Sequence, residues 1–401
     1  MVAIVGQGYV GLPLSIICSK HFENVIGIDS DFTKIEALRA ALSYVEDVDS
    51  RDLSGALRSG FEPTNDFSRI SNASIIVICV PTPLNEEGDP DLTSLNKACQ
   101  EIAKHVAEGA LIINQSTSYP STVREMIAPL IIEKSGKTKL KFAVSPERVN
   151  PGNREWSYTN TPRIVGGLDK EALEKAVRFY RNFCMEVLSV SSLEVAEMSK
   201  LLENSYRLVN ISLVNEFASL AREMEIDIFE VIEAAATKPY GFAKFSPSIG
   251  VGGHCIPVDP VYASNFGRRM GIELSVVEEA TRVNFKVTRS LFETICKKFP
   301  DKGKKILVCG ISYKPGVSDT RESASIKLLQ LLRQQYVNVV WWDSLISNNL
   351  GELSHDLSSK VHLAIITQEI DDKSFSQISE NAEQIIDCSG KFRNRPKVLS
   401  W

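Results

Sequence analysis

The feature that most constrains this chain is a glycine-rich turn between two apolar segments close to its start. Val2–Val5 is followed by Gly6, Gly8 and Gly11, and the next apolar segment, Val25–Asp29, ends in an acid. This order is typical of the strand, turn, helix and strand of a dinucleotide-binding βαβ unit. Gly6 would make the tight bend, Gly8 would let a pyrophosphate approach the backbone, and Gly11 would let the helix pack on the strand. The helix N-terminus would add free N–H groups and a positive dipole.

The acid at the end of the second segment indicates which dinucleotide is bound. The Asp29 carboxylate would accept hydrogen bonds from the adenosine ribose and repel a 2'-phosphate, so the sequence favours NAD over NADP. The alternative is a glycine turn that serves packing alone. Tyr9 and Val10, inside the turn, belong to the predicted cofactor site. Thr82, in "VPTP" after a later apolar run, is a further candidate, although a rigid proline turn would explain the same residues.

Further apolar segments of strand length alternate with helical ones. Strands are expected at Ile75–Val80, Leu111–Asn114, Phe142–Val144, Ile306–Gly310 and Val337–Asp343, and helices at Thr93–Val106 and Ser323–Gln335. This alternation predicts an α/β architecture with parallel sheets covered on both faces. The last two strands follow a "PDKGKK" segment and form a second α/β unit that lacks the glycine motif of the first.

A long stretch without proline or glycine separates the two α/β units. It runs from Ser192 to Glu225 and predicts one helix on the order of 50 Å long. Its apolar residues cover more than one face, so we expect it to be buried between domains or between subunits. The predicted domains are a Rossmann domain at 1–190, a central helical and dimerisation region at 191–298, and a Rossmann-like domain at 299–401.

Composition excludes several functional classes. The 401 residues carry a formal net charge of −5, which gives no support for binding to nucleic acid or to an anionic membrane. No apolar run approaches the roughly 20 residues of a membrane helix, and the chain opens on a strand pattern, so we expect a cytoplasmic protein. The eight cysteines form no CxxC pair, so we expect no metal site.

One cysteine differs from the others. Seven cysteines lie in apolar patterns and are expected to be buried, reduced thiols, whereas Cys255 lies in "GVGGHCIPVD". Beside a bound nicotinamide, a thiol could add to an aldehyde and carry it through a thiohemiacetal to a thioester, which water would release as an acid. The glycines suggest a flexible hinge that carries the thiol. The alternative for Cys255 is a small residue in a tight turn.

Other candidate catalytic residues lie on the long helix and in the loop after the cysteine. Lys200 and Asn204 are spaced i, i+4, so they share a helix face and could donate two hydrogen bonds to an alkoxide. Alone, Lys200 could equally be a solvated charge. Asp259, expected in a loop beyond Pro257, could steer a water or pair with Lys200, or it could cap a turn.

Polar groups also follow predicted strands. Thr117 lies in "QSTSYP", and Glu147 and Arg148 lie in "SPER", each directly after a strand. Such side chains can hold a cofactor or order a water. Lys314 and Arg321 flank a turn after the first strand of the second α/β unit. They could bind phosphate or ribose oxygens, unless the loop is simply solvated.

Seven motifs, in this order, resemble the UDP-glucose/GDP-mannose dehydrogenase family over nearly the whole chain. They are "GQGYVGLPLS", "VPTP", "STSYPSTV", "SPERVNPG", "AEMSKLLENSYRLVNISLVNE", "GVGGHCIPVDP" and "GISYKPGVSDTRES". The resemblance implies two NAD-dependent oxidations at one site, from alcohol through aldehyde to carboxylate. It also implies two Rossmann-like domains joined by a long helix that builds a homodimer or a dimer-based oligomer, and a place in polysaccharide precursor synthesis.

The resemblance implies a role for each candidate residue. Cys255 would be the covalent nucleophile, Lys200 and Asn204 would stabilise the oxyanion, and Asp259 would assist water and proton transfer. Thr117 and Glu147 would order the hydrolytic water, Lys314 would bind the sugar nucleotide, and Arg321 would bridge towards the cofactor. The residues expected around the substrate are Glu147, Arg148, Lys200, Asn204, Arg207, Tyr240, Phe245, Gly252, His254 and Lys314.

Two departures from the UDP-glucose enzymes indicate an acetamido sugar. Those enzymes usually carry a lysine shortly before the equivalent of Asp259, where Ile256–Val258 stands here. They also tend to have a second acid four residues after the equivalent of Glu147, where Pro151 stands. Both features resemble the branch that oxidises UDP-N-acetylhexosamines. We favour UDP-N-acetylglucosamine over UDP-N-acetylmannosamine, although local motifs do not report the C2 configuration.

Two other functions are compatible with parts of the pattern. A two-electron dehydrogenase of the hydroxyacid type also carries a lysine and an asparagine on a helix after a Rossmann domain, but it would not need Cys255. A non-enzymatic NAD-responsive protein would need the glycine turn but not Cys255, Lys200 and Asn204 together.

Overall fold

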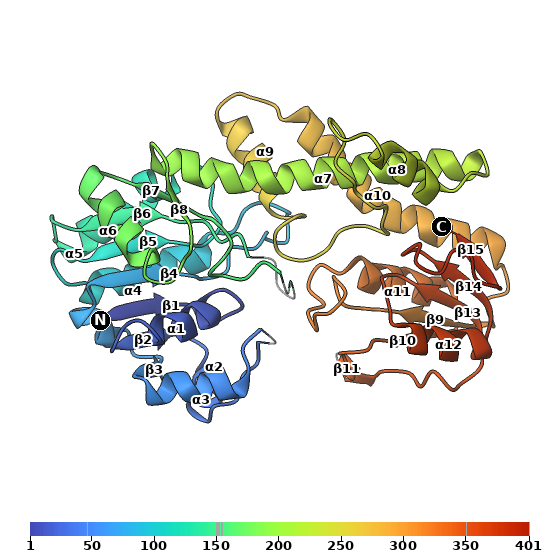
Figure 1. Cartoon of the computed structure of the whole chain (residues 1–401), viewed down its shortest axis with the longest axis horizontal. Coiled ribbons are helices and arrows are strands. Elements are labelled where there is room, and N and C mark those ends of the chain that lie inside the picture. Colours follow the sequence, from blue (N-terminus) through green and yellow to red (C-terminus); the bar gives the residue numbers. More distant parts are fainter. Residues whose placement is uncertain (46, 150–152, 154, 350, 401) are drawn as a thin grey trace. The chain divides into compact units, whose positions relative to one another are not determined.

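The computed structural model describes residues 1–45, 47–149, 153, 155–349 and 351–400, and the chain divides into two compact units (Figure 1). The first unit contains residues 1–203 and 265–271, and the second contains 204–264 and 272–401. Helix α7 (Leu193–Glu223) contributes residues to both units. The domain boundaries at 190 and 298 remain a prediction.

The first unit is built around an eight-stranded sheet with the order β3-β2-β1-β4-β5-β6-β7-β8. Its strands are β1 (Val2–Val5), β2 (Val25–Ile28), β3 (Phe61–Thr64), β4 (Ile75–Ile78), β5 (Leu111–Asn114), β6 (Lys141–Val144), β7 (Arg163–Gly167) and β8 (Val187–Ser189). All neighbours are parallel except β6 and β7. Alternate residues of β1 belong to two separate apolar clusters, so both faces of the sheet are covered as predicted.

Short helices connect these strands. They are α1 (Gly11–Ser19), α2 (Phe32–Arg39), α3 (Ser50–Arg58), η1 (Phe67–Asn72), α4 (Thr93–His105), η2 (Val123–Ile127), α5 (Ala128–Ser135) and α6 (Lys170–Tyr180). Four of them begin after an aspartate whose side chain accepts hydrogen bonds from the first turn: Asp31, Asp49, Asp66 and Asp169. These N-caps satisfy N–H groups that have no partner within the helix.

The second unit contains a five-stranded parallel sheet with the order β10-β9-β13-β14-β15. Its strands are β9 (Lys305–Cys309), β10 (Asn338–Trp342), β13 (Val361–Ile366), β14 (Ala382–Asp387) and β15 (Val398–Ser400), and β11 (Asn348–Asn349) pairs with β12 (Glu352–Leu353). Its other helices are α8 (Ile228–Ala236), α10 (Ser275–Lys298), α11 (Ala324–Gln335) and α12 (Asp372–Asn381). The predicted second α/β unit is therefore confirmed.

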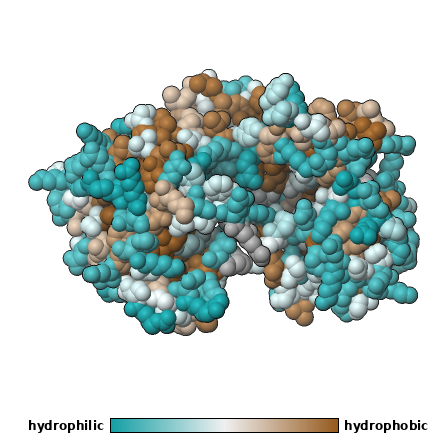
Figure 2. Space-filling model, viewed as in Figure 1, coloured by the Kyte–Doolittle hydropathy of each residue, from teal (hydrophilic) through white to brown (hydrophobic). Residues whose placement is uncertain are grey.

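The long helix is also confirmed, with 31 residues in α7. Leu201 and Leu208 are fully buried, whereas Leu202 and Phe217 are 68% and 52% exposed in the single chain. Figure 2 shows other hydrophobic residues interspersed among hydrophilic ones on the visible surface. Within the described residues, no helix is long and apolar enough to cross a membrane.

Candidate active site

The glycine turn between β1 and α1 has the geometry that the sequence predicts. Gly6 has a positive φ of 95°, and a Cβ on Gly11 would lie 1.8 Å from the Gly6 carbonyl oxygen. A Cβ on Gly8 would meet nothing within 4 Å, so this side of the turn is open. Val10 precedes α1, and no described side chain caps that helix N-terminus. The turn therefore fits a bound pyrophosphate.

Asp29 is fixed beside this turn. Its two carboxylate oxygens accept hydrogen bonds from the backbone N–H groups of Gln7 and Asp31, both at 2.9 Å, and the Lys34 ammonium lies 3.6 Å away. The Tyr44 hydroxyl donates to the Gln7 carbonyl, and burial raises the pKa of Tyr44. Because each carboxylate oxygen has a second lone pair, Asp29 can still accept ribose hydroxyls, so these residues fit NAD.

The other predicted cofactor residues lie close to the apolar core. Tyr9 and Val10 are partly buried and pack against the apolar cluster on one face of the sheet. Thr82 is partly buried in the segment after β4, and the Ser116 hydroxyl donates to the Val80 carbonyl of that segment at 2.7 Å. This hydrogen bond ties the segment after β4 to the segment after β5.

Thr117 and Lys200 are brought together. The Lys200 ammonium donates to the Thr117 hydroxyl at 2.6 Å, and Lys200 is only 7% exposed. The surrounding cavity, of about 10 Å³, is also lined by Ser116, Pro146 and Glu197. A cavity of this size holds about one water. Lys200 is thus a buried charge, and the solvated-face alternative is wrong.

Sequence reasoning missed Glu197, which lies one helical turn before Lys200 on α7. Its carboxylate accepts the backbone N–H groups of Ser121 at 2.7 Å and Val123 at 3.2 Å, and burial raises its pKa to about 8. The signal was an acid at i−3 from Lys200, which places both side chains on one face of the helix.

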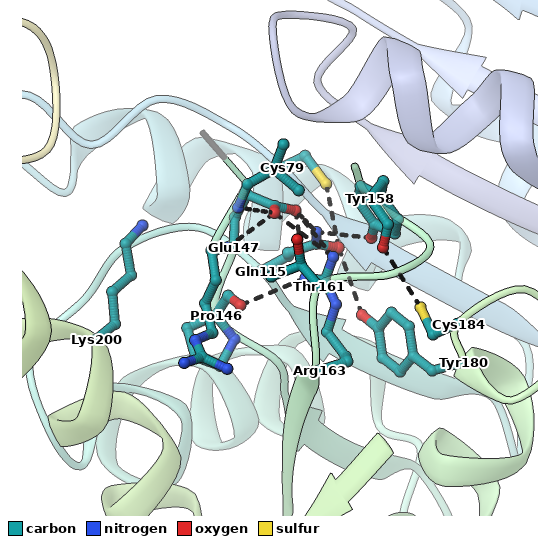
Figure 3. Close-up of polar contacts among 12 residues, drawn as sticks. Cys79, Gln115, Pro146, Glu147, Tyr158, Thr161, Arg163, Tyr180, Cys184 and Lys200 are labelled. Carbon is teal, nitrogen blue, oxygen red and sulfur yellow. Dashed lines mark hydrogen bonds and ion pairs between the residues drawn. The ribbon is translucent and has the colours of Figure 1, made fainter. Parts of the chain in front are cut away.

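Glu147 follows β6 and lies in a buried polar cluster (Figure 3). It forms an ion pair with Arg163 at 3.2 Å and accepts a hydrogen bond from the Gln115 amide. Arg148 points elsewhere, because its guanidinium pairs with Glu203 at 2.7 Å and donates to a backbone carbonyl. Pro151, the position of the missing second acid, lies outside the described residues.

In the second unit, three predicted residues meet around the cysteine loop. Cys255 is exposed, and its carbonyl accepts the backbone N–H of Asp259 at 2.8 Å. The fully buried Asp259 accepts a hydrogen bond from the Asn204 amide at 2.6 Å. Asp259 is the first residue of α9 (Asp259–Arg269), so its predicted position in a loop is wrong. Six of the other seven cysteines are buried as expected, and Cys296 is half-buried.

The glycines before Cys255 are tightly packed, which argues against the predicted flexible hinge. Gly250 and Gly253 have positive φ values of 120° and 84°. A Cβ on Gly252 would lie 2.5 Å from the Glu322 carbonyl oxygen, and one on Gly253 would lie 2.8 Å from the Tyr313 ring. These glycines allow close approach of backbone to backbone, which fixes the position of the thiol.

Charged groups of the loop after β9 lie next to this glycine segment. The Arg321 carbonyl accepts the Gly253 N–H at 3.2 Å, while its guanidinium donates to Asp319 at 2.8 Å. Burial and then the charge of Arg321 lower the pKa of His254, whose buried Nε2 has no hydrogen-bond partner within the described chain. Both effects favour the neutral imidazole of His254. Lys314 is half-buried in the same loop.

The remaining predicted substrate residues are exposed or half-buried in the second unit. Phe245 packs edge to face on Tyr206 with ring centroids 5.9 Å apart. Tyr240 is 73% exposed and lies under the Lys238 ammonium, and Arg207 is exposed. The role of Tyr240, Phe245 and Arg207 in substrate binding therefore stays a prediction.

An aspartate, Asp343, stands at the position in the second sheet that Asp29 has in the first. Its carboxylate makes more hydrogen bonds to the backbone than that of Asp29. Asp343 follows β10, and each of its two oxygens accepts two backbone N–H groups, from Ile311 at 2.9 Å and Ser312 at 3.1 Å, and from Leu345 at 2.9 Å and Ile346 at 3.3 Å. It is 6% exposed. Since these bonds fill the carboxylate, it cannot also accept ribose hydroxyls, and the second unit lacks this element of a dinucleotide site.

Comparison with known proteins identifies the family. Models of the UDP-glucose/GDP-mannose dehydrogenase family match residues 1–184 (NAD binding domain), 194–286 (central domain) and 307–386 (UDP binding domain). The chain is 32% identical over 358 residues to UDP-N-acetyl-D-glucosamine 6-dehydrogenase of Pseudomonas aeruginosa, covering 86% of this chain and 83% of that protein. It is 33% identical over 371 residues to UDP-N-acetyl-D-mannosamine dehydrogenase of Pyrococcus horikoshii, covering 90% and 86%.

The fold agrees with this assignment. The solved structure of UDP-D-ManNAc dehydrogenase from Pyrococcus horikoshii matches 100% of this chain and 98% of its own, with a TM-score of 0.88 and 28% identity. A UDP-glucose dehydrogenase from Pyrobaculum islandicum has the same TM-score of 0.88 at 21% identity and shows the shared fold. The chain therefore belongs to the UDP-glucose/GDP-mannose dehydrogenase family and is an NAD-dependent nucleotide-sugar dehydrogenase.

Proposed function

We propose that this enzyme oxidises the C6 alcohol of a UDP-N-acetylhexosamine to the acid, with UDP-N-acetylglucosamine as substrate and UDP-N-acetylmannosamine as the alternative. The observation that carries the proposal is the exposed Cys255, whose backbone carbonyl accepts the N–H of Asp259, together with the buried hydrogen bond between Asp259 and Asn204. Relatives named for each sugar resemble this chain at 32% and 33% identity, so both sugars belong in the test. A two-electron hydroxyacid dehydrogenase would have no use for the thiol.

The proposed reaction passes through a covalent intermediate on Cys255. After the alcohol is oxidised to the aldehyde, the thiolate attacks the aldehyde carbon, and the new C–S bond gives a thiohemiacetal. Its oxidation gives a thioester, and attack by water breaks the C–S bond, releases the carboxylate and returns the thiol. The glycine turn and Asp29 would hold NAD, which would supply the hydride acceptor, one NAD for each oxidation. Each oxidation releases one proton, and hydrolysis of the thioester to the carboxylate and the thiol releases a third.

We expect Lys200 and Asn204 to stabilise the oxygen that becomes charged. They lie one turn apart on α7, and both are largely buried, where a fixed donor is most effective. The bond to Asp259 fixes the orientation of the Asn204 amide, and its other N–H can face the substrate. Thr117 is held by Lys200 and would order the hydrolytic water together with Glu147.

We expect the second unit to bind the UDP portion. Its family model is the UDP binding domain. Lys314 and Arg321 lie in the loop after β9 and supply positive charge for the diphosphate. The saturated Asp343 carboxylate argues against a second dinucleotide at this sheet.

We further propose a homodimer that covers the exposed face of α7. The exposed apolar residues of this helix recur every three, four or seven positions, as in paired helices: Val195, Met198, Leu202, Tyr206, Leu213, Phe217 and Leu220. Sedimentation equilibrium should give twice the chain mass. A monomer at micromolar concentration would contradict the dimer.

The covalent mechanism is tested with Cys255→Ala and, as a control, Cys296→Ala at the half-buried cysteine. Cys255→Ala should form no sugar acid yet bind NADH as the wild type does, whereas Cys296→Ala should turn over normally. The acid is measured by mass spectrometry, and NADH binding by fluorescence titration. Normal acid formation by Cys255→Ala would remove the thiol from the mechanism.

A further inference from the structure

Gln7, the residue between the first two glycines of the cofactor turn, is completely buried and uses all of its polar groups. Its backbone N–H donates to Asp29 at 2.9 Å, and its backbone carbonyl accepts the Tyr44 hydroxyl at 2.5 Å. Its side-chain Nε2 donates to the Ile4 carbonyl and its Oε1 accepts from the Ser15 hydroxyl, both at 2.9 Å. Hydrogen bonds to four other residues therefore fix Gln7 in one position.

The side chain of Gln7 also fits closely against the neighbouring strand. A Cβ on Gly27, in β2, would lie 2.7 Å from the amide carbon of Gln7. The amide therefore has no room to move towards β2, and any rotation would leave buried polar groups unpaired, which is costly. The side chain thus holds the backbone of the turn from below.

The fixed carbonyl of Gln7 sets the direction of the next N–H. The bond between Gln7 and Gly8 is a planar trans peptide, in which the carbonyl and the N–H point to opposite sides. Because the Gln7 carbonyl faces Tyr44, the Gly8 N–H faces away from Tyr44. Among the residues that the structure describes, that N–H finds no acceptor. An unpaired N–H in an open glycine turn is a donor that a phosphate can use.

Tyr44 is placed to hold this peptide. It lies between α2 and α3, 37 positions after Gln7, and it is half-buried. Its ring packs against the apolar cluster on one face of the first sheet. Burial and then the charges of Asp29 and Asp31 raise the pKa of Tyr44, so its hydroxyl keeps its proton and remains a donor at neutral pH.

We propose that Tyr44 is a positioning residue of the cofactor site, whose hydroxyl holds the Gln7 carbonyl and thereby presents the Gly8 N–H to the pyrophosphate of NAD. Tyr44 acts through Gln7 and not by contact with a reacting atom. The inference goes beyond the proposed function and does not depend on it, because it concerns the binding of NAD and no sugar. None of the seven sequence motifs contains Tyr44.

The binding test compares Tyr44→Phe, which removes only the hydroxyl, with Tyr336→Phe. Tyr336 is the matched control, because its hydroxyl also donates to a backbone carbonyl at 2.5 Å, that of Phe299 in the second unit. The dissociation constant of NADH is measured by fluorescence titration. Tyr44→Phe should raise it about 2–12-fold, the effect of losing one hydrogen bond, and Tyr336→Phe should leave it unchanged.

The peptide between Gln7 and Gly8 can be observed on its own, because glutamine precedes glycine only here in the chain. Protein labelled with ¹³C at the glutamine carbonyls and with ¹⁵N at the glycines therefore gives a single cross-peak in a triple-resonance NMR spectrum. In Tyr44→Phe without cofactor, the carbonyl resonance should move upfield, whereas Tyr336→Phe should match the wild type. Addition of NADH to the wild type should move the amide resonance of Gly8.

An unchanged dissociation constant in Tyr44→Phe would overturn the proposal, and so would weaker binding with an unmoved Gln7 carbonyl resonance. A Gly8 amide that NADH does not move in the wild type would also overturn it. If Tyr44→Phe does not fold, replacement of Tyr44 by 3-fluorotyrosine decides. The more acidic hydroxyl of that residue is a stronger donor and should move the carbonyl resonance downfield, and an unmoved resonance would contradict the proposal.

None of these measurements uses a sugar, so their outcome is separate from that of the proposed function. A wild type that binds NADH but oxidises no UDP-sugar would refute the proposed function and leave the role of Tyr44 standing.

Discussion

The packed glycine segment makes a prediction whose size can be worked from the structure. In Gly252→Ala the new Cβ would lie 2.5 Å from the Glu322 carbonyl oxygen and 3.1 Å from the Ser323 Cα. These are backbone atoms, so one of the two loops must move. Gly252 has no positive φ, so the cost is steric only, and overpacking of this kind costs about 1–3 kcal/mol.

Substitution of three other glycines of the second unit distinguishes the cost of steric overlap from the cost of placing alanine at a positive φ. Gly351 has a φ of 85° with nothing within 4 Å of its Cβ position, so Gly351→Ala should lose about 1–2 kcal/mol. Gly303 has neither feature, because its nearest neighbour is 3.5 Å away, and Gly303→Ala should stay within about 0.5 kcal/mol of the wild type. Gly253→Ala combines a φ of 84° with the Tyr313 ring at 2.8 Å and should lose the most.

The assay is urea unfolding followed by tryptophan fluorescence in a Trp156→Phe background. All other tryptophans of the chain then lie in the second unit, which also contains the four glycines. We expect the order Gly253→Ala, then Gly252→Ala and Gly351→Ala, then Gly303→Ala. If Gly252→Ala is no less stable than Gly303→Ala, the loop is the flexible hinge that the sequence suggested, and close packing does not position the thiol.

Two further predictions concern α7. Lys200→Met should lower kcat roughly 10²–10³-fold, because one preorganised donor is lost, and should leave NADH binding unchanged in a fluorescence titration; a loss confined to KM would argue against oxyanion stabilisation. Burial raises the pKa of Glu197 to about 8 in the folded chain, so the native state holds the proton more tightly than the unfolded one. This contribution to stability should be full below about pH 4 and lost as the pH rises through 8. Urea unfolding at pH 5, 7 and 9 should therefore show a free energy of unfolding that decreases with pH in the wild type and decreases less in Glu197→Gln. Equal decreases in both proteins would contradict the prediction.

The parts of the fold that could be predicted are those with a local signal. β1 and β5 have the predicted bounds, because buried parallel strands are continuous apolar runs. β3 was missed because it contains Pro63, which an edge strand tolerates. The start of α9 was missed although Asp259 is followed by Pro260, and a proline directly after the first residue favours a helix start.

The candidate site also contains residues that a local sequence signal identifies and residues that meet only through tertiary contacts. Motif spacing was enough to nominate Cys255 and Asp259. The partners of Glu147 could not be predicted, because Arg163 and Gln115 are separated from it by 16 and 32 positions and meet it only when neighbouring strands pair. The packing of Gly252 against the loop after β9 is a tertiary contact of the same kind.

The most direct test of the account counts NADH formed per sugar consumed, with excess NAD and limiting UDP-N-acetylglucosamine, UDP-N-acetylmannosamine or UDP-glucose in parallel. The account predicts two NADH per sugar with one of the two N-acetylhexosamines. One NADH per sugar would mean that the reaction stops at the aldehyde and would contradict the role of Cys255. No NADH with any of the three would contradict the proposed substrate class.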